Sequence, residues 1–291
     1  QMSFIDFARI HGVEINPSRF YASDKIKRCG TVDKPRSTNG AYYWDGEKGW
    51  VYNWAGESRV EWYNDPNAKP WTDEDKRAWA AKRQSYAQEQ EKKYQQAAQK
   101  ADIMLRAAER KTHDYLHLKG FPEELSLVLE GRLMIPMRDV VTNALRGYQA
   151  IHWLHDERKF EKKMMTGMRA KGAVFWMGSR QAPEIWFVEG YATGLSLHAA
   201  LKAMGIPAAV VVTFSAGNLV HCAGLVKGNR FVFADNDESQ TGQKSAEQTG
   251  LPWTMADTVG WDANDLHKHK GVFAVSQKVM EVRNATQKLQ A

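Results

Sequence analysis

From residue 184 onward, short apolar runs alternate with segments of helical character. EIWFVEG, PAAVVVTF and RFVFADND have the continuous apolar pattern of buried strands. Helices are expected at 192–204, 219–228 and 244–249, with a last helix over about 275–289. Alternation of this kind is typical of a parallel sheet with crossover helices, so it predicts an α/β domain.

The preceding segment also contains strand patterns. RLMIPMRD, LRGYQAIHWL and AVFWMG predict three strands. Two short helices, broken at Gly120-Phe121-Pro122, are expected before them over 112–130. These elements predict a domain of strands and short helices over 112–180, which precedes the parallel sheet in the chain.

The amino-terminal part of the chain predicts a small module and a long helix. A short helix is expected over 2–15, ending at Gly12, and Asp45-Gly46 is a hairpin signal between the aromatic runs AYYW and GWVYNW. These runs predict a small antiparallel sheet. From Thr72, an expected N-cap, to about Lys111 no Gly or Pro occurs, which predicts a helix of roughly 60 Å. Its sparse apolar positions favour a charged spacer over a partner-binding helix.

The composition is that of a globular protein, because 43% of the 291 residues are apolar and 25% are charged. No run approaches the roughly 18 apolar residues of a membrane span, and the first residues lack the pattern of a secretory signal. We therefore expect a cytoplasmic protein without a membrane partner. Two cysteines, Cys29 and Cys222, cannot form a disulfide framework or a four-cysteine zinc site.

Basic residues are concentrated in one segment. The chain carries 40 Lys and Arg against 34 Asp and Glu, a net charge of +6. Residues 131–180 contain ten basic and four acidic residues, so the whole excess lies there. A segment of this kind favours a polyanionic partner such as a nucleic acid.

Three carboxylates follow apolar strands. Glu189 comes directly after IWFV, and Asp235 and Asp237 come after FVFA. The carboxyl ends of parallel strands meet at the edge of the sheet where α/β folds bind ligands. An all-oxygen set there suits Mg²⁺ or Mn²⁺, not zinc, and would serve phosphoryl or nucleotidyl transfer. The alternative is that these acids only cap helices or end strands. Their position after two apolar strands, separated by one strand and its helices, favours a metal site.

VEGYATGLSLHAAL, PAAVVVTFSAGNL and FVFADNDESQTGQKSAEQTG, in this order, resemble the Toprim domain that primases, topoisomerases and some nucleases share. The resemblance implies that Glu189, Asp235 and Asp237 are catalytic and hold a divalent metal ion. GWDANDLH is similar to a later stretch of phage and plasmid Toprim primases, which implies Asp262 and Asp265 as further metal ligands. Asp265 could equally be a helix cap.

Upstream, GRLMIPMRD, LRGYQAIHW and KFEKKMMTGMRAKGAVFWMG resemble the basic subdomain of DnaG-type primases. The resemblance implies that four cations bind the template or the incoming nucleotide: Arg138, Arg146, Lys163 and Lys171.

NGAYYWDGEKGWVYNWAGE resembles the small sheet module of phage and plasmid primases, in which a zinc ribbon often occurs. Cys29 is the only local cysteine, so no zinc is expected here. Trp44, Trp50 and Trp54 could stack on unpaired bases. For most of these rings, packing in a core is the slightly favoured alternative.

The resemblance covers roughly residues 113–270 and implies a DNA primase. Such an enzyme makes short RNA primers on single-stranded DNA by metal-dependent nucleotidyl transfer, here for phage or plasmid replication in a bacterial host. Its partners would be the template and ribonucleoside triphosphates, with a separate replicative helicase or single-strand-binding protein as a further candidate. The alternatives are a Toprim nuclease or nicking enzyme, and a non-catalytic single-stranded DNA-binding accessory protein.

The expected fold class is α/β, and α+β overall, with a Rossmann-like parallel Toprim sheet. The expected domains are a β-rich module without zinc ligands (1–65), a long charged helical linker (66–111), a basic primase subdomain (112–180), the Toprim domain (181–272) and a C-terminal helix (273–291).

Overall fold

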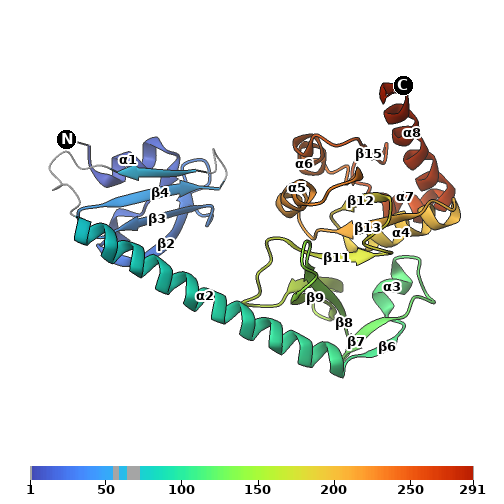
Figure 1. Ribbon diagram of the computed structural model, residues 1–291, viewed down its shortest axis with the longest axis horizontal. Helices are drawn as coiled ribbons and strands as arrows, with labels where there is room; N and C mark the ends of the chain where they lie inside the picture. Colours follow the sequence, from blue (N-terminus) through green and yellow to red (C-terminus); the bar gives the residue numbers. More distant parts are fainter. Residues whose placement is uncertain (1, 55–58, 64–72, 291) are drawn as a thin grey trace. The chain divides into compact units, whose positions relative to one another are not determined.

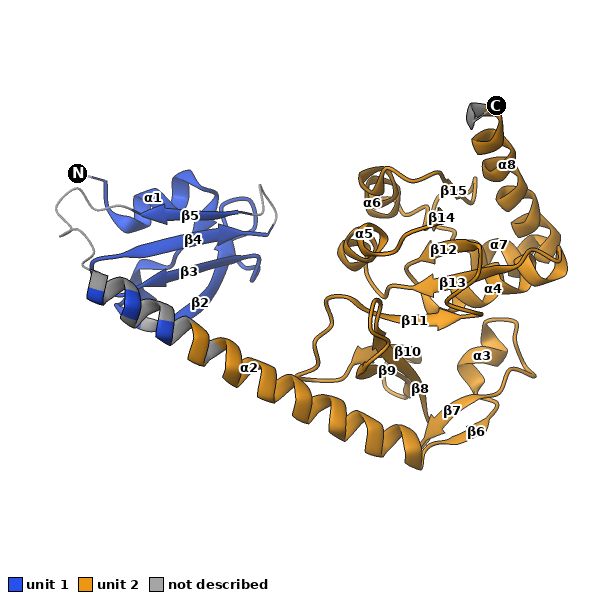
Figure 2. Ribbon diagram, viewed as in Figure 1, with its two compact units in different colours: residues 1–83 blue, residues 84–291 orange. Residues whose placement is uncertain are grey.

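A computed structural model of the chain describes residues 2–54, 59–63 and 73–290 (Figure 1). The chain forms two compact units, residues 1–83 and 84–291 (Figure 2). The expected N-cap of the long helix, Thr72, lies outside the described residues.

The amino-terminal unit contains an antiparallel sheet whose five strands follow one another in chain order. The predicted hairpin is present: Asp45 Oδ1 accepts hydrogen bonds from the backbone N–H groups of Glu47 and Lys48, and Gly46 has a φ of 110°. The predicted first helix is also present but shorter. The elements are α1 (Phe4–Ile10), β1 (Val13–Glu14), the 3₁₀ turn η1 (Pro17–Arg19), β2 (Ser23–Thr31), β3 (Gly40–Trp44), β4 (Gly49–Asn53) and β5 (Val60–Tyr63).

Aromatic rings form the core of this unit. Phe4 is buried, and its ring stacks on Trp44 with centroids 4.7 Å apart and on Phe20 at 5.8 Å. Tyr63 meets the same ring edge to face at 5.5 Å. Trp44 therefore packs in a core, which is the alternative that the sequence slightly favoured.

The long helix α2 (Asp73–Ala107) has 35 residues and extends from one unit into the other. It ends four residues earlier than expected, because Glu109–Lys111 joins a sheet as β6. The last turns of α2 pack against other residues of the second unit and are not a solvated spacer. Ala97 and Ala101 are buried, Tyr148 donates a hydrogen bond to the Met104 sulfur at 3.2 Å, and Arg169 lies over the Tyr94 ring.

The second unit is built on one continuous sheet of ten strands. Eight strands run in the order β10-β9-β8-β11-β13-β12-β14-β15, β7 pairs with β8, and β6 pairs with β7. Pairing is parallel from β13 through β12 and β14 to β15, as the strand–helix alternation predicts, and antiparallel elsewhere. The strands are β6 (Glu109–Lys111), β7 (Ser126–Leu129), β8 (Arg132–Asp139), β9 (Leu145–Leu154), β10 (Lys159–Met164), β11 (Ala173–Met177), β12 (Glu184–Val188), β13 (Ala208–Val212), β14 (Asn229–Ala234) and β15 (Trp253–Met255).

Helices cover both faces of the parallel strands (Figure 1). On one face, α4, α7 and α8 pack on Trp186, Val188 and the strand residues in register with them. On the other, α5 and α6 pack on Ile185 and Phe187. The helices of this unit, apart from α2, are α3 (Asp114–Leu118), α4 (Tyr191–Ala203), α5 (Ala216–Leu225), α6 (Thr241–Thr249), α7 (Ala263–Lys270) and α8 (Val272–Gln290).

Besides β6, four elements of the second unit differ from the prediction. The second short helix expected within 112–130 is wrong: Ser126–Leu129 is strand β7, because its apolar residues pair with β6 and β8. The charged strand β10 and the three-residue strand β15 have weak apolar patterns and were not predicted. Helix α7 was not predicted either, although its cap, Asp262, was singled out for its chemistry.

In the part of the chain that the structure describes, no helix combines the length and the apolar character needed to cross a bilayer.

Besides its apolar contacts, the C-terminal helix is joined to the sheet by an ion pair whose carboxylate is buried. Glu184, 5% exposed, accepts a hydrogen bond from Trp186 Nε1 at 2.7 Å and from Arg283 Nε at 3.1 Å. Replacing Arg283 by Met would leave this carboxylate buried with one partner fewer. We expect the free energy of unfolding to fall by about 3 kcal/mol.

Urea unfolding followed by tryptophan fluorescence measures this change. The double variant Glu184→Gln/Arg283→Met should lose clearly less than the sum of the two single variants, because no unpaired charge remains. Additive losses would contradict this account of the pair.

Candidate functional site

An acidic pocket lies at the carboxyl ends of two adjacent parallel strands. Glu189 follows β12 and Asp235 follows β14, and these strands pair directly, with Ile185 opposite Arg230. Both carboxylates line a pocket with a volume of about 180 Å³, and Asp262 lines it as well. The structure thus brings together three of the five acidic residues that the sequence singled out.

The main chain around Glu189 is held by the end of the neighbouring strand. Phe214 has a φ of 64°, in the left-handed region, and its N–H donates to the Glu189 carbonyl oxygen at 2.9 Å. Gly190 then starts helix α4, and a Cβ at this position would lie 2.9 Å from the Thr193 hydroxyl oxygen. A larger residue after Glu189 would therefore have to displace the Thr193 side chain, which favours glycine at this position.

Asp235 carries the most perturbed carboxylate of the pocket. Burial raises its pKa to about 7, the charges of Asp262 and Glu189 add to the effect, and Lys162 partly offsets it. Its Oδ1 is buried and accepts no hydrogen bond from any residue that the structure describes. Burial and the charge of Asp237 also raise the pKa of Glu189, again with Lys162 acting in the opposite direction. Raised pKa values of this origin are typical of functional carboxylates.

Asp262 combines a structural role with its place in the pocket. Its Oδ1 accepts from the N–H groups of Asn264 and Asp265 at 2.7 and 2.8 Å, and its Oδ2 accepts from the Thr193 hydroxyl at 2.9 Å. Asp265 completes a capping box by accepting from the Asp262 N–H at 3.3 Å. Of the two roles considered for Asp265, the structure shows the helix cap.

Asn236, between the two aspartates of the DND motif, ties the strand end to the segment before α7. Its N–H donates to the Trp261 carbonyl oxygen at 3.1 Å, and its side chain donates to the Ala256 carbonyl oxygen at 2.9 Å. These bonds bring Asp262 next to Asp235. No sequence pattern singled out Asn236.

Asp237 lies beside the pocket and faces helix α6. Its carboxylate accepts from the N–H groups of Thr241 and Gly242 at 3.1 and 2.9 Å, and from the Ser239 hydroxyl. The hydrogen bond from Ser239 and those from the helix start lower its pKa. Asp237 is close enough to raise the pKa of both Glu189 and Asp235, but it does not line the pocket.

Two lysines, Lys119 and Lys162, line the pocket together with the acids, and the sequence did not indicate either. Lys119 caps α3, and its carbonyl oxygen accepts a hydrogen bond at 2.8 Å from the fully buried Asn264. Lys162 lies on β10, and its amine lies 5.7 Å from the centre of the Tyr115 ring. The signal that could have identified Lys162 is strand alternation, but it is useful only once β10 is recognised as a strand.

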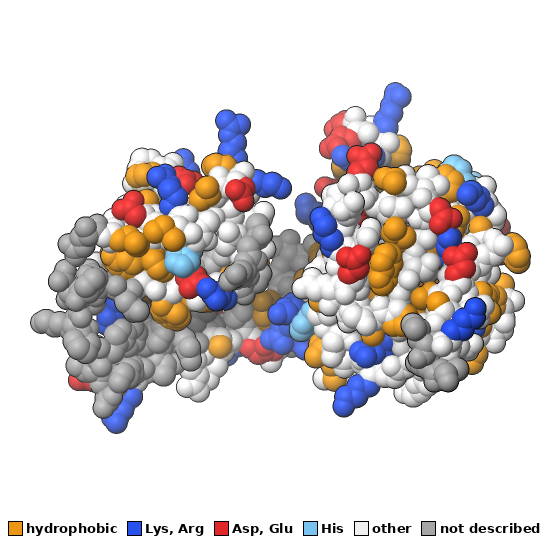
Figure 3. Space-filling view, turned by 90° about the horizontal axis from the view of Figure 1, so that it is seen from above, with side chains coloured by type: hydrophobic (Ala, Val, Ile, Leu, Met, Phe, Trp, Pro, Cys, Tyr) orange, Lys and Arg blue, Asp and Glu red, His pale blue; other side chains and the backbone are white. Residues whose placement is uncertain are grey.

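The four cations named from the resemblance do not line this pocket. Lys163 neighbours Lys162 in strand β10, so its side chain points to the opposite sheet face. Arg138 donates to the Asn143 carbonyl oxygen at 3.2 Å. Lys171 is exposed, and its charge adds to burial in lowering the pKa of His221. On the face shown in Figure 3, basic and acidic side chains of the second unit are interspersed rather than gathered in one patch.

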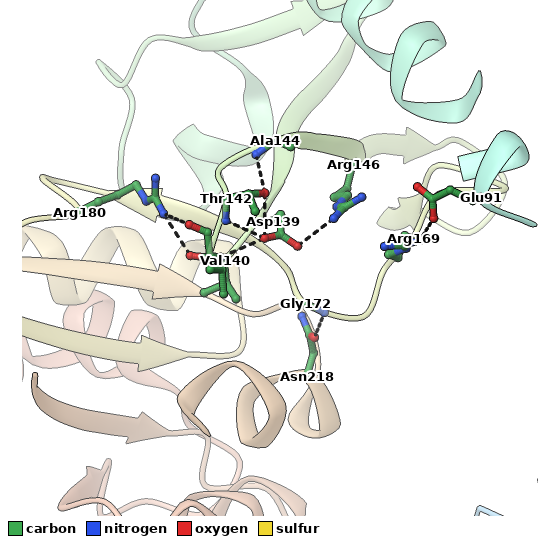
Figure 4. Close-up of polar contacts among 11 residues, drawn as sticks. Glu91, Asp139, Val140, Thr142, Ala144, Arg146, Arg169, Gly172, Arg180 and Asn218 are labelled. Carbon is green, nitrogen blue, oxygen red and sulfur yellow. Dashed lines mark hydrogen bonds and ion pairs between the residues drawn. The ribbon is translucent and has the colours of Figure 1, made fainter. Parts of the chain in front are cut away.

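Arg146 forms an ion pair with Asp139 at the turn between β8 and β9 (Figure 4). Its Nη2 lies 3.1 Å from Asp139 Oδ2, and the other oxygen of Asp139 accepts from the Thr142 N–H at 2.8 Å. Partial burial would raise the pKa of Asp139, but the hydrogen bonds from Thr142 and Arg146 outweigh it and lower the pKa. Arg146 thus holds the turn in shape.

The remaining tryptophans of the amino-terminal unit differ in exposure. Trp50 is half-buried and stacks on Tyr43 with centroids 6.4 Å apart. Trp54 is 46% exposed, and the Arg28 guanidinium lies 3.8 Å from the centre of its ring. Of the three tryptophans named from the sequence, Trp54 has the surface that a stacked base would need.

The donor chemistry of the pocket fits Mg²⁺ or Mn²⁺. Among the described residues, no three His, Cys, Asp or Glu side chains are placed so that they alone could hold a metal ion. Mg²⁺, however, is usually bound by one or two carboxylates together with water and substrate phosphates. Glu189 and Asp235 would supply such a pair, and the buried Asp235 Oδ1, which accepts no hydrogen bond from a described residue, would be available to a cation.

No protein-family model matches the chain, and no curated protein matches it. Among solved structures, a structure described as the DnaG catalytic core is weakly similar, with a TM-score of 0.36 and 17% sequence identity. The match covers 52% of this chain and 52% of the other, so the chain spans about half the length of that structure. This similarity is too weak to indicate an activity.

The raised pKa of Asp235 predicts a pH-dependent effect of Asp235→Asn on stability. The folded-state pKa of about 7 lies above the unfolded value, so ionising the buried carboxylate destabilises the fold as the pH rises from about 4 through 7. The amide cannot ionise. We expect Asn to stabilise the protein at pH 8, by at most about 4 kcal/mol, and to change stability little at pH 4.

Urea unfolding at both pH values, with metal ions removed by a chelator, measures the effect. Asp237→Asn is the matched control, because the pKa of Asp237 is lowered and its carboxylate is hydrogen-bonded. That variant should be less stable than wild type at pH 8. A gain from Asp235→Asn that is the same at both pH values would contradict the prediction.

Proposed function

We propose that the acidic pocket catalyses metal-dependent nucleotidyl transfer and that the chain is a DNA primase. The observation that carries the proposal is the lining of the pocket, in which three carboxylates and two lysines converge. Carboxylates bind divalent cations, and lysines bind phosphate groups as point charges. Both are needed where a nucleoside triphosphate reacts with the hydroxyl of a growing chain.

In this proposal the carboxylates and the lysines have different tasks, and Asp262 mainly caps α7 beside them. Glu189 and Asp235 hold the cation, and Asp237 adds negative charge beside them. A divalent cation bound there would neutralise charge that develops on the phosphate oxygens and favour ionisation of the attacking hydroxyl. Lys119 and Lys162 bind and orient the triphosphate. Since Asp235 must be ionised to bind the cation, binding should weaken as the pH falls through about 7.

The template would bind outside the pocket. Arg138, Lys163 and Lys171 are exposed and suited to contact DNA phosphates irrespective of sequence. In the amino-terminal unit, Trp54 with Arg28 offers an exposed ring for stacking on an unpaired base. The order of the Toprim-like motifs supports a primase of the phage or plasmid type in a bacterial cytoplasm. A separate replicative helicase or single-strand-binding protein would supply its template.

The direct test is incubation with single-stranded DNA, labelled ribonucleoside triphosphates, and Mg²⁺ or Mn²⁺. Short labelled products are expected. A shortened DNA strand without labelled products would indicate a nuclease instead. DNA binding without either product would indicate an accessory protein.

Metal binding predicts a thermal shift that does not depend on activity. Mg²⁺ or Mn²⁺ should raise the melting temperature of the wild type at pH 8, because a cation that binds only the folded state stabilises it. Glu189→Gln should lose most of this shift while remaining folded without metal. An equal shift in both proteins, measured by differential scanning fluorimetry, would place the cation elsewhere.

The neighbouring lysines of β10 give a matched pair of variants. Lys162→Ala should raise the KM for ribonucleotides about 10- to 100-fold, since it removes a charged hydrogen-bond donor to phosphate. Lys163→Ala, on the opposite face, should leave the KM nearly unchanged and weaken DNA binding instead. Steady-state synthesis at varied nucleotide concentration, with DNA binding measured in parallel, distinguishes the two. Equal effects on KM would contradict the role of Lys162.

A further inference from the structure

Gln149 is a largely buried residue that lines the acidic pocket. It lies on β9, is 8% exposed, and sits opposite Met164 of β10 and Ile135 of β8. Directly opposed residues of an antiparallel pair share a sheet face, and so do residues two apart in one strand. Gln149 and Lys162 therefore project from the same face of the sheet, toward the carboxylates.

The amide of Gln149 forms no hydrogen bond with any residue that the structure describes. Buried polar side chains are almost always paired within the protein, and those that are not have water or a ligand as partner. The other uncharged polar groups of the pocket are occupied: Thr193 donates to Asp262 at 2.9 Å, and the Tyr191 hydroxyl lies 3.1 Å from that of Ser126. Of the three uncharged polar side chains that line the pocket, Gln149 is therefore the one that is available to hydrogen-bond a ligand.

The size and charge of the pocket restrict what the amide can meet. Its volume of about 180 Å³ is below the range of about 300–1,000 Å³ typical of pockets that enclose a whole drug-sized ligand. Only part of a nucleotide fits, and the carboxylates and lysines select the end that carries phosphates. The uncharged polar groups that follow the phosphates of a nucleotide belong to its sugar, and they are the ring oxygen and the hydroxyls. An amide can both donate to and accept from a hydroxyl.

We propose that Gln149 hydrogen-bonds the 2′-hydroxyl of the bound nucleotide and thereby selects ribonucleotides over deoxyribonucleotides. This inference rests on the proposed function. A side chain that pairs with the 2′-hydroxyl allows a protein to distinguish the two sugars. A site built around such a bond rejects the analogue that lacks the hydroxyl, because the buried amide is then left unpaired. Gln149 is accordingly a specificity-determining residue.

The test compares ATP and dATP binding to the whole chain in the presence of Mg²⁺. Affinities are measured by competition against a fluorescent ATP analogue for the wild type, for Gln149→Met, and for Gln248→Met as a control on the exposed surface of α6. The wild type should prefer ATP. Gln149→Met, which keeps the length of the side chain, should bind ATP about 10-fold more weakly and dATP almost unchanged. The control should match the wild type.

The outcomes separate this inference from the proposed function. A wild type that binds ATP and dATP equally, or a Gln149→Met variant that loses both equally, overturns the role of Gln149 and leaves nucleotidyl transfer standing. A wild type that binds neither overturns both. The melting temperature of Gln149→Met should stay close to that of the wild type, since the amide makes no hydrogen bond with a described residue that the substitution could remove. A fall of several degrees would show that the amide is structural and would overturn the inference.

Discussion

Strand β11 is the element on which the candidate site depends. Its first residues, Ala173 and Val174, pair with the end of β8, and Phe175–Met177 pair with β13. Five residues thus join the antiparallel strands and the parallel strands into one sheet. The carboxylates come from the parallel part, and Lys162 and Gln149 come from the antiparallel part. Without the shared strand, neither half would have a pocket with both kinds of group.

The DND motif shows how local hydrogen bonding separates similar residues. Asp235 and Asp237 stand two positions apart, but the pKa of one is raised and that of the other is lowered. Asp235 is buried, with one oxygen that accepts no hydrogen bond from a described residue, whereas Asp237 accepts bonds from Ser239 and from the start of α6. Burial without a partner favours the neutral form, and donated hydrogen bonds favour the charged form. Asp235 is therefore the carboxylate of the motif that is available to a ligand. Asp237 is already hydrogen-bonded within the protein.

The sequence predicted the parts of the site that depend on apolar strands. Glu189 and Asp235 could be placed because each follows a run of buried residues, and parallel strands end at one edge. Lys162 was not placed, because four of the six residues of KFEKKM are charged and the segment was not recognised as a strand. Once it is read as a strand, Phe160 and Met164 share a face with Lys162 and mark it as the inward lysine. Lys119 is still harder to find, since it reaches the pocket through a contact with Asn264, 145 positions away. Such pairings arise from tertiary packing, which periodicity does not describe.

Three residues that contribute no charge hold the backbone around the pocket in place, and two of them, Asn236 and Asn264, do not line it. Asn236 joins the end of β14 to the segment that carries Asp262, and Asn264 holds the main chain of Lys119 against α7. Phe214, in a left-handed conformation, supports the main chain of Glu189 and lines the pocket as well. Each of the two asparagines uses its side-chain amide to satisfy a backbone carbonyl oxygen that would otherwise be left without a donor. Acidic residues alone would repel one another at this edge of the sheet. They can be held together because neutral polar side chains fix the surrounding backbone, and because lysines from two other segments supply the opposite charge.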